Sequence, residues 1–284
     1  MKQILSRFTA AAALALAAAG SAHATEPDLK MYRLDCGQMT LGDKSMMSDR
    51  GLYKGQSYDI VMSCYLIKHG QDWLLWDAGL PRKYLAGPLV EGSFTTRLSR
   101  TIVDQLKDLG LSADDISYVA VSHSHFDHAG QLNDFPKATL IIQRAEVEAM
   151  ADKAEAPKHY IDAELFSSHI SGDQLKRVRL VDGDVDLFGD GLLKTIQTPG
   201  HTPGSMALLL NLKHAGPYVL SGDQWHFTEN HERQQVPIWN YDHAETVSSG
   251  EKLDRLIART GATLVIQHEP VDNQKLPKLP RFLD

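Results

Sequence analysis

The sequence predicts an α/β sandwich, in which mixed β-sheets are covered on their outer faces by helices. Strand-like and helical runs occur together in both halves of the chain, which is typical of this class. A hairpin early in the chain requires antiparallel pairing, which favours mixed over purely parallel sheets. The 284 residues are 43% hydrophobic and 23% charged, and no repeat or linker divides them. We therefore expect a single domain over residues 25–284.

Residues 1–24 have the pattern of a secretory signal peptide. Lys2 and Arg7 precede the apolar run 8–19, and residues 22–24 read Ala-His-Ala, a cleavage signature. The apolar run is too short to span a bilayer, and no second run follows it. We expect cleavage after Ala24 and a protein that is exported, periplasmic or secreted, with no membrane span after cleavage.

The first half of the chain alternates strands with helices. Residues 58–68 predict a strand that turns at Gly70 into a second strand, giving a hairpin. Apolar residues at helical spacing predict a helix over 97–109, closed by Gly110. The hairpin's second strand and the other elements expected here are strands at 72–77, 116–121 and 139–142 and a helix near 144–153.

The second half is richer in strands. Its expected elements are strands at 177–181, 192–197, 206–212, 218–221 and 263–267 and a helix near 249–260. Two stretches, 80–96 and 225–243, fit no regular element. Long loops in compact domains tend to be functional.

A dense group of metal-binding residue types follows the strand at 116–121. The segment Ser122-His123-Ser124-His125-Phe126-Asp127-His128 places four such side chains within six residues. In an extended or turning backbone, His123 and His125 point the same way, and Asp127 and His128 can face a second point nearby. Imidazole nitrogens and carboxylate oxygens bind zinc or a similar divalent ion.

Three more positions repeat this pattern at the ends of predicted strands. His201 lies in the turn Thr198-Pro199-Gly200-His201-Thr202-Pro203-Gly204, Asp223 follows the strand at 218–221, and His268 ends the strand at 263–267. With the first group they would complete a two-metal site. Six other histidines lack such placement and are expected to be solvated: His69, His159, His169, His214, His231 and His243.

These motifs, together with Leu75-Trp76-Asp77-Ala78-Gly79, resemble the metallo-β-lactamase superfamily. The resemblance implies an αββα fold and two divalent ions, with Zn²⁺ as the expected metal. It assigns His123, His125 and His201 to one ion, Asp127, His128 and His268 to the other, and Asp223 as the bridge between them. It also implies that Asp77 orients one of the ligand histidines.

Two ions about 3.5–4 Å apart can share a bridging hydroxide at neutral pH, so the expected reaction is hydrolysis. The hydroxide would attack an electrophilic carbonyl or phosphorus, and Asp127 would pass a proton to the leaving group. No serine or cysteine nucleophile is required.

Within the superfamily, the chain closely resembles the N-acyl homoserine lactonases. The shared features are Cys64-Tyr65-Leu66-Ile67, residues 75–79 and 123–130, and the separations of His201, Asp223 and His268. This resemblance implies opening of the lactone ring and quenching of a diffusible signal (quorum quenching). The alternatives are hydrolysis of another ester or of a phosphotriester on the same fold, and a periplasmic zinc-binding protein without turnover.

One position departs from that pattern. Many such lactonases carry a tyrosine three residues after the bridging aspartate, which hydrogen-bonds the lactone carbonyl, and here that position is His226. A histidine could donate the same bond or a proton, or it could be a loop residue without a catalytic contact. Trp225 and Phe227 flank it and are expected to line an apolar substrate pocket. Met46, Met47, residues 80–89 and the other aromatic residues of 225–241 are expected to pack the edge of the sandwich or a dimer contact.

Charge and cysteine content limit the partners. The formal net charge is −7 at pH 7, and there is no basic cluster, so nucleic acid is not an expected partner. Cys36 and Cys64 could pair in an oxidising compartment or remain separate buried thiols. An oligomer is possible.

Overall fold

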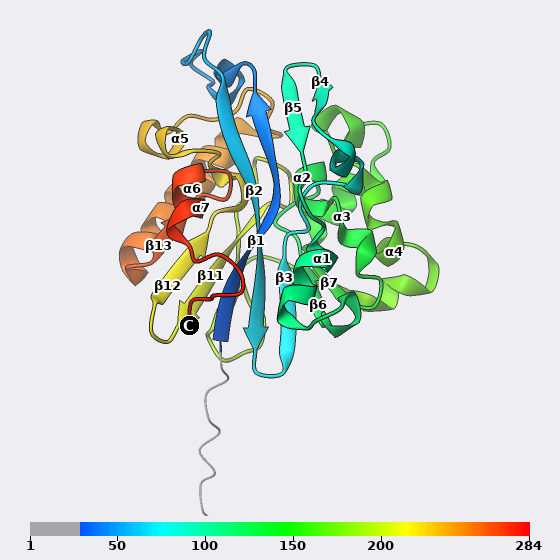
Figure 1. Cartoon of the computed structure of the whole chain (residues 1–284). Coiled ribbons are helices and arrows are strands. Elements are labelled where there is room, and N and C mark those ends of the chain that lie inside the picture. The colour runs from blue at the N-terminus through cyan, green and yellow to red at the C-terminus, as the bar shows by residue number, and fades with distance from the viewer. Residues whose placement is uncertain (1–28) are drawn as a thin grey trace, which may run out of the picture.

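Two mixed β-sheets lie face to face between layers of helices in the computed structural model, which describes residues 29–284 (Figure 1). The predicted signal peptide, residues 1–24, lies outside the described residues. The larger sheet has the order β4 (Leu89–Glu91), β5 (Phe94–Arg97), β1 (Leu29–Leu41), β2 (Tyr58–His69), β3 (Asp72–Trp76), β6 (Tyr118–Ala120), β7 (Thr139–Gln143), β8 (Val178–Val181). The smaller sheet has the order β13 (Thr263–Val265), β12 (Gly216–Leu220), β11 (Met206–Leu212), β10 (Leu193–Gln197), β9 (Val185–Asp186).

Helices cover both outer faces, which confirms the predicted sandwich. The outer face of the larger sheet is covered by α1 (Ile102–Leu106), α2 (Phe126–Ala129), α3 (Arg144–Ala151) and α4 (Ser167–Ile170). The smaller sheet is covered by α6 (His243–Thr260), and the remaining helices are α5 (Thr228–Arg233) and α7 (Pro270–Lys275). No helix in residues 29–284 combines the length and the apolar character needed to cross a membrane.

The sandwich core follows from the two-residue alternation of side chains along each strand. Tyr65 and Ile67 of β2 face the smaller sheet, and Leu208 and Leu210 of β11 face back toward them. The intervening residues pack under the helices, such as Leu66 under the α1–α4 layer. Both sheets are therefore fixed between two apolar layers, and the strand ends carry rigidly placed loops.

Several predicted elements have different bounds in the structure. The helix predicted over 97–109 is α1 followed by a 3₁₀ turn at Lys107–Leu109, because Arg97 ends β5 and Thr101 caps the helix through Asp104 N. The two stretches expected to be irregular contain β4 and β5 in the first case and α5 in the second. The helix predicted near 249–260 is α6, which begins earlier, at His243, because the side chain of Asp242 caps it by accepting from Glu245 N.

The longest strand, β1, was not predicted. Tyr32, Leu34 and Cys36 alternate on one face up to a register shift between Asp35 and Gln38, where Gly37 has φ 125°. The bulge moves the alternation by one residue, so the period-two signal does not extend through the strand.

Cys36 of β1 and Cys64 of β2 form a buried disulfide. The sequence had left open whether the two cysteines pair or remain separate thiols. The bond lies against Gly79, where an added Cβ would be 2.5 Å from Cys36 Cβ. The turn that follows Asp77 therefore packs directly on the disulfide, and only glycine fits there.

Candidate metal centre

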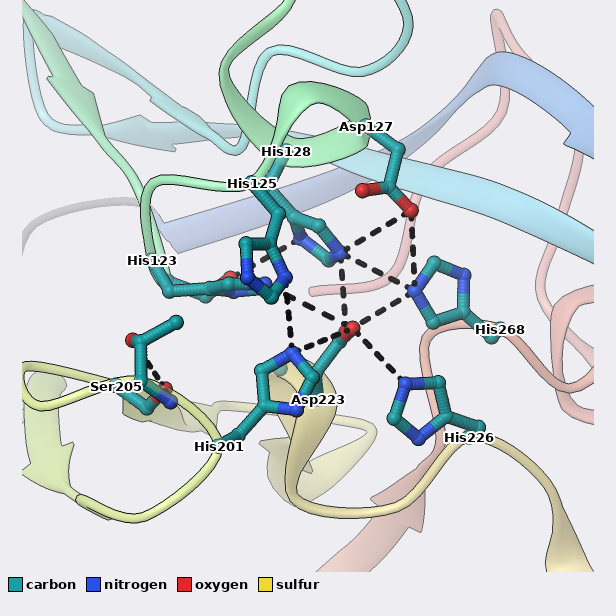
Figure 2. A network of polar contacts seen from close by, with 12 residues as sticks. His123, His125, Asp127, His128, His201, Ser205, Asp223, His226 and His268 are labelled. Carbon is teal, nitrogen blue, oxygen red and sulfur yellow. Dashed lines mark hydrogen bonds and ion pairs between the residues drawn. The ribbon is translucent and has the colours of Figure 1, made fainter. Parts of the chain in front are cut away.

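All seven predicted metal ligands converge at strand ends of both sheets (Figure 2). The loop between β6 and α2 carries His123 and His125, and α2 carries Asp127 and His128. His201 follows β10, Asp223 follows β12, and His268 follows β13. The histidines and carboxylates come from separate loops, yet their ends point toward one another.

The ligand atoms form two groups, each lying within 4.8 Å. The first metal group consists of His123, His125, His201 and Asp223, all of them buried. The second metal group consists of Asp127, His128 and His268.

Asp223 lies between the two groups and presents one oxygen to each. Its Oδ1 is 3.0 Å from both His128 Nε2 and His268 Nε2. Its Oδ2 is 3.3 Å from His201 Nε2 and 3.7 Å from His123 Nε2. This is the arrangement that a carboxylate shared between two cations requires.

The donor set fits divalent cations better than it fits a hydrogen-bond network. Asp223 Oδ1 and His123 Nε2 are buried and have no hydrogen-bond partner, although nitrogens and oxygens lie close to both. Buried polar atoms of this kind are costly unless something else satisfies them. Imidazole and carboxylate groups that converge in this way are typical ligands of divalent metal ions.

The nitrogen of each ligand histidine that faces away from the centre is held by a partner. His125 Nε2 lies 2.9 Å from His159 O, His201 Nδ1 lies 3.0 Å from Asn240 Oδ1, and His268 Nδ1 lies 2.8 Å from Val61 O. His123 Nδ1 lies 3.0 Å from the Ser122 hydroxyl. Because a carbonyl or amide oxygen only accepts, the contacts of His125, His201 and His268 place the proton on the outer nitrogen and leave the inner nitrogen free to bind a cation.

Asp77 supports the second metal group from behind. Its Oδ2 is 2.9 Å from His128 Nδ1 and also accepts from Gln267 Nε2 at 2.8 Å, and its Oδ1 accepts from Ser122 N. The side chain of Gln267 in turn accepts from Trp76 Nε1 and Gly222 N. Asp77 therefore contacts the outer nitrogen of His128 and fixes the orientation of that ring.

Glu146, at the start of α3, is a buried residue that the sequence analysis missed. Its carboxylate accepts from Ser124 N at 2.7 Å, from Gly204 N at 2.8 Å and from the Thr202 hydroxyl at 2.8 Å. Nothing in its local sequence marks it, because its partners lie 22 to 58 residues away.

The two metal groups differ in their electrostatics. Burial lowers the pKa values of His123 and His125 well below the ordinary histidine value, and the neighbouring histidines add to this effect. Burial also opposes the charged forms of His128 and His268, but Asp223 and the other nearby carboxylates outweigh it and raise both pKa values. For Asp223, burial is outweighed by His128 and His268, so its pKa is held well below the usual range.

His226 also points into the centre, with Nε2 3.3 Å from Asp223 Oδ2 and its ring stacked on His268 at 5.6 Å. Burial lowers its pKa, and Asp223 only partly opposes the shift. Its buried Nδ1 has no hydrogen-bond partner. Unlike the ligand histidines, His226 has no partner on its outer nitrogen that would fix its tautomer.

An apolar cavity, open to solvent, ends at this centre. Its base is formed by His125, Asp127, Asp223, His226 and His268. Its walls are formed by Met39, Leu41, Met46, Met47, Ile60, Phe94, Phe126, Tyr160 and Trp239.

The prediction that Trp225 and Phe227 line this cavity is wrong. Both residues are in extended conformation on either side of His226, so their side chains point opposite to it. Trp225 packs under α6 with Leu253, and Phe227 packs on Tyr58 at 5.1 Å. Met46, Met47 and Trp239, which were expected to pack elsewhere, form the walls instead.

Two of the histidines expected to be solvated are buried. His169 lies in the helical layer over the larger sheet, and His69 stacks on Phe188 and contacts Asp190. Neither belongs to the centre.

Comparison with known proteins agrees with this geometry. A family model described as the metallo-beta-lactamase superfamily matches residues 60–268. An N-acyl homoserine lactonase, AttM, from Azorhizobium caulinodans is 31% identical over 90% of this chain and 99% of its own length. An N-acyl homoserine lactonase from a Bacillus species is 28% identical over 89% of this chain and 98% of its own.

Solved structures show the same fold. An AiiA variant from B. thuringiensis with N-decanoyl-L-homoserine at its active site superposes with a TM-score of 0.76 and 25% identity, covering 91% of this chain and all of that one. An N-acyl homoserine lactone hydrolase with its product at the catalytic metal centre superposes with the same TM-score, identity and coverage.

Proposed function

The chain belongs to the metallo-β-lactamase superfamily and is a metal-dependent hydrolase, and we propose that it opens the lactone ring of N-acyl homoserine lactones to release the free acid. The observation that carries this proposal is the position of the converged ligands at the base of an apolar cavity. A lactone headgroup would meet the centre while its acyl chain lies along the methionine and aromatic walls.

We propose two divalent ions, Zn²⁺ first among them, one in each metal group. When bound, they would supply a water-derived nucleophile at neutral pH and an electrophile for the carbonyl oxygen. His123, His125 and His201 would hold one ion, and Asp127, His128 and His268 would hold the other, with Asp223 shared.

His226 is proposed to donate an N–H to the lactone carbonyl oxygen. It lines the cavity, its Nε2 lies beside Asp223, and burial lowers its pKa, so it would be a neutral donor at the reacting carbonyl. The matched variants are His226→Tyr, which keeps a donor, and His226→Phe, which removes it. We expect His226→Phe to lower kcat by about 100-fold and His226→Tyr to retain most of the activity. Equal activity in the two variants would remove His226 from the mechanism.

Asp127 is proposed to hold the proton for the departing ring oxygen. It lines the cavity base, and its side chain is the most exposed among the ligands, at 11%. If Asp127→Asn kept both metals and full turnover, this role would be excluded.

The experiment that tests the proposed function is proton release. Zinc-loaded protein is mixed with N-acyl homoserine lactones of short and long chain, with a chelated sample as the control. Rapid acidification that the chelator abolishes is the expected result. If two metals per chain are present and no acidification occurs, the substrate proposal fails, and aryl esters, phosphotriesters and a chromogenic cephalosporin are assayed next. Metal binding with no hydrolysis in any of these assays would favour a zinc-binding protein without turnover.

Export of the protein is also proposed. A buried disulfide is typical of proteins that fold in an oxidising compartment, which supports the pattern of residues 1–24. Cell fractionation and N-terminal sequencing test this proposal, and a mature chain that begins at Thr25 outside the cytoplasm is expected. An uncleaved cytoplasmic chain would contradict it.

A further inference from the structure

Glu146 connects the two loops that carry the three histidines of the first metal group. Ser124, which lies between His123 and His125, donates its backbone N–H to Glu146 Oε1 at 2.7 Å, and its hydroxyl donates to the same oxygen. The other oxygen, Oε2, accepts from the Thr202 hydroxyl and from Gly204 N, each at 2.8 Å. Thr202 directly follows His201.

These loops begin on different sheets, one after β6 and the other after β10. His125 Nδ1 and His201 Nε2 nevertheless lie only 3.1 Å apart. Glu146 is fully buried and is held by the helix α3, so it gives both loops one fixed reference point.

The packing around Glu146 leaves little room for another arrangement. A Cβ on Gly204 would lie 2.4 Å from Glu146 N, so the His201 loop approaches α3 as closely as a backbone can. The hydroxyls of Thr202 and Ser205 also form a hydrogen bond of 2.8 Å, which holds the Thr202 hydroxyl in position to donate to Glu146.

We propose that Glu146 is a positioning residue for the first metal group, and that its carboxylate sets the spacing of the His123–His125 and His201 loops and hence the affinity of that group for a metal ion. The inference rests on the metal-binding part of the proposed function and not on the identity of the substrate. A glutamine cannot replace Glu146, because its amide nitrogen would face either the donors of Ser124 or those of Thr202 and Gly204 in place of an acceptor.

The test is a metal titration of Glu146→Gln with Co²⁺, followed by visible absorption and by metal analysis. Contacts of this kind are worth about 10–100-fold in metal affinity, and we expect that loss in the first metal group with the second unchanged. At limiting metal, Glu146→Gln should hold one ion per chain, and its Co²⁺ spectrum should match that of His201→Ala. The matched control is Glu148→Gln on the exposed side of the same helix, which should bind two ions like the unchanged protein.

Thr202→Val provides a second, milder test in case Glu146→Gln does not fold. It removes one of the four donors and should weaken the first group in the same direction by a smaller factor. Full two-metal binding by the variants would overturn the proposal, and so would equal weakening of both groups. If the unchanged protein itself bound no metal, the proposed function would fail before this inference was tested.

Discussion

Each metal group is supported by a buried carboxylate, and the two carboxylates make different kinds of contact. In the second group, Asp77 touches a ligand directly, with its carboxylate 2.9 Å from His128 Nδ1. In the first group, Glu146 touches no ligand side chain and holds the backbone and hydroxyls of the loops around the ligands instead. Asp77 can therefore change the basicity of an imidazole, whereas Glu146 can change only where imidazoles lie.

A buried carboxylate can thus act on a metal site in two ways. Asp77 can change the basicity of a ligand, and Glu146 can change the positions of the ligands. Both are fully enclosed, and both join segments from distant parts of the chain. The predictions below separate the two modes, starting with the residue common to both groups.

Removing the carboxylate that the two metal groups share should weaken both groups at once. Asp223→Ala takes one oxygen from each group, and we expect activity to fall by more than about 100-fold, because even contacts outside the ligand set are worth 10–100-fold. Metal analysis and initial rates of lactone opening check this prediction. Asp173→Ala, at a side chain that is 93% exposed, is the control and should behave like the unchanged protein. Full two-metal binding by Asp223→Ala would show that the groups are independent.

Asp77→Asn should weaken the second group by about 10–100-fold while the first keeps its metal. An amide has only one oxygen, so it cannot accept from His128 and Gln267 on one side and from Ser122 N on the other, and the support of His128 is weakened. The measurement is the Co²⁺ titration used for Glu146→Gln, and the two variants should lose opposite ions. Loss of the same ion from both variants would contradict the comparison.

Acidification should release the metal of the second group first. Metal binding requires unprotonated imidazoles, and the pKa values of His128 and His268 are raised in the metal-free protein, while those of His123 and His125 are lowered. As the pH falls through the raised values, protons displace the second ion while the first group still binds. Chelator competition between about pH 8 and 5 checks the order of release. Simultaneous release of the two ions would refute it.

The smallest effect on activity should come from a substitution in the cavity wall, which contacts neither Asp77 nor Glu146. Met46→Ala removes part of the apolar surface along the proposed acyl chain. At about 1–2 kcal/mol of lost burial, kcat/KM for long-chain lactones should fall about 5–30-fold, with short-chain lactones and metal content nearly unchanged. An equal loss for both chain lengths would place the acyl chain elsewhere.

The sequence predicted the parts of the molecule that local patterns determine. Spacing and strand-end position were enough to bring His123, His201 and His268 to one place, because each motif sits on a strand that the apolar pattern also marks. Asp77 was predicted from the resemblance of residues 75–79 to the family's motif. The hairpin of β2 and β3 and most of the later strands were predicted for the same reason.

Features that depend on tertiary contacts could not be predicted from the sequence. Glu146 and Gln267 act through partners far along the chain, so no local signal identifies them. The error at Trp225 and Phe227 has a simpler cause: neighbours of an inward-pointing residue on an extended segment must face away. A bulge at Gly37 interrupted the alternation that would have revealed β1.

The centre also joins distant parts of the chain, since its ligands extend from position 123 to position 268 and come from both sheets. The disulfide, in contrast, connects neighbouring strands within one sheet. An unfolded chain would have to close very long loops before the ligands meet, so the full ligand set exists only after the sheets have docked. We therefore expect metal to be captured late in folding, and a bound ion to favour the docked sandwich by mass action, as a cross-link between the two sheets.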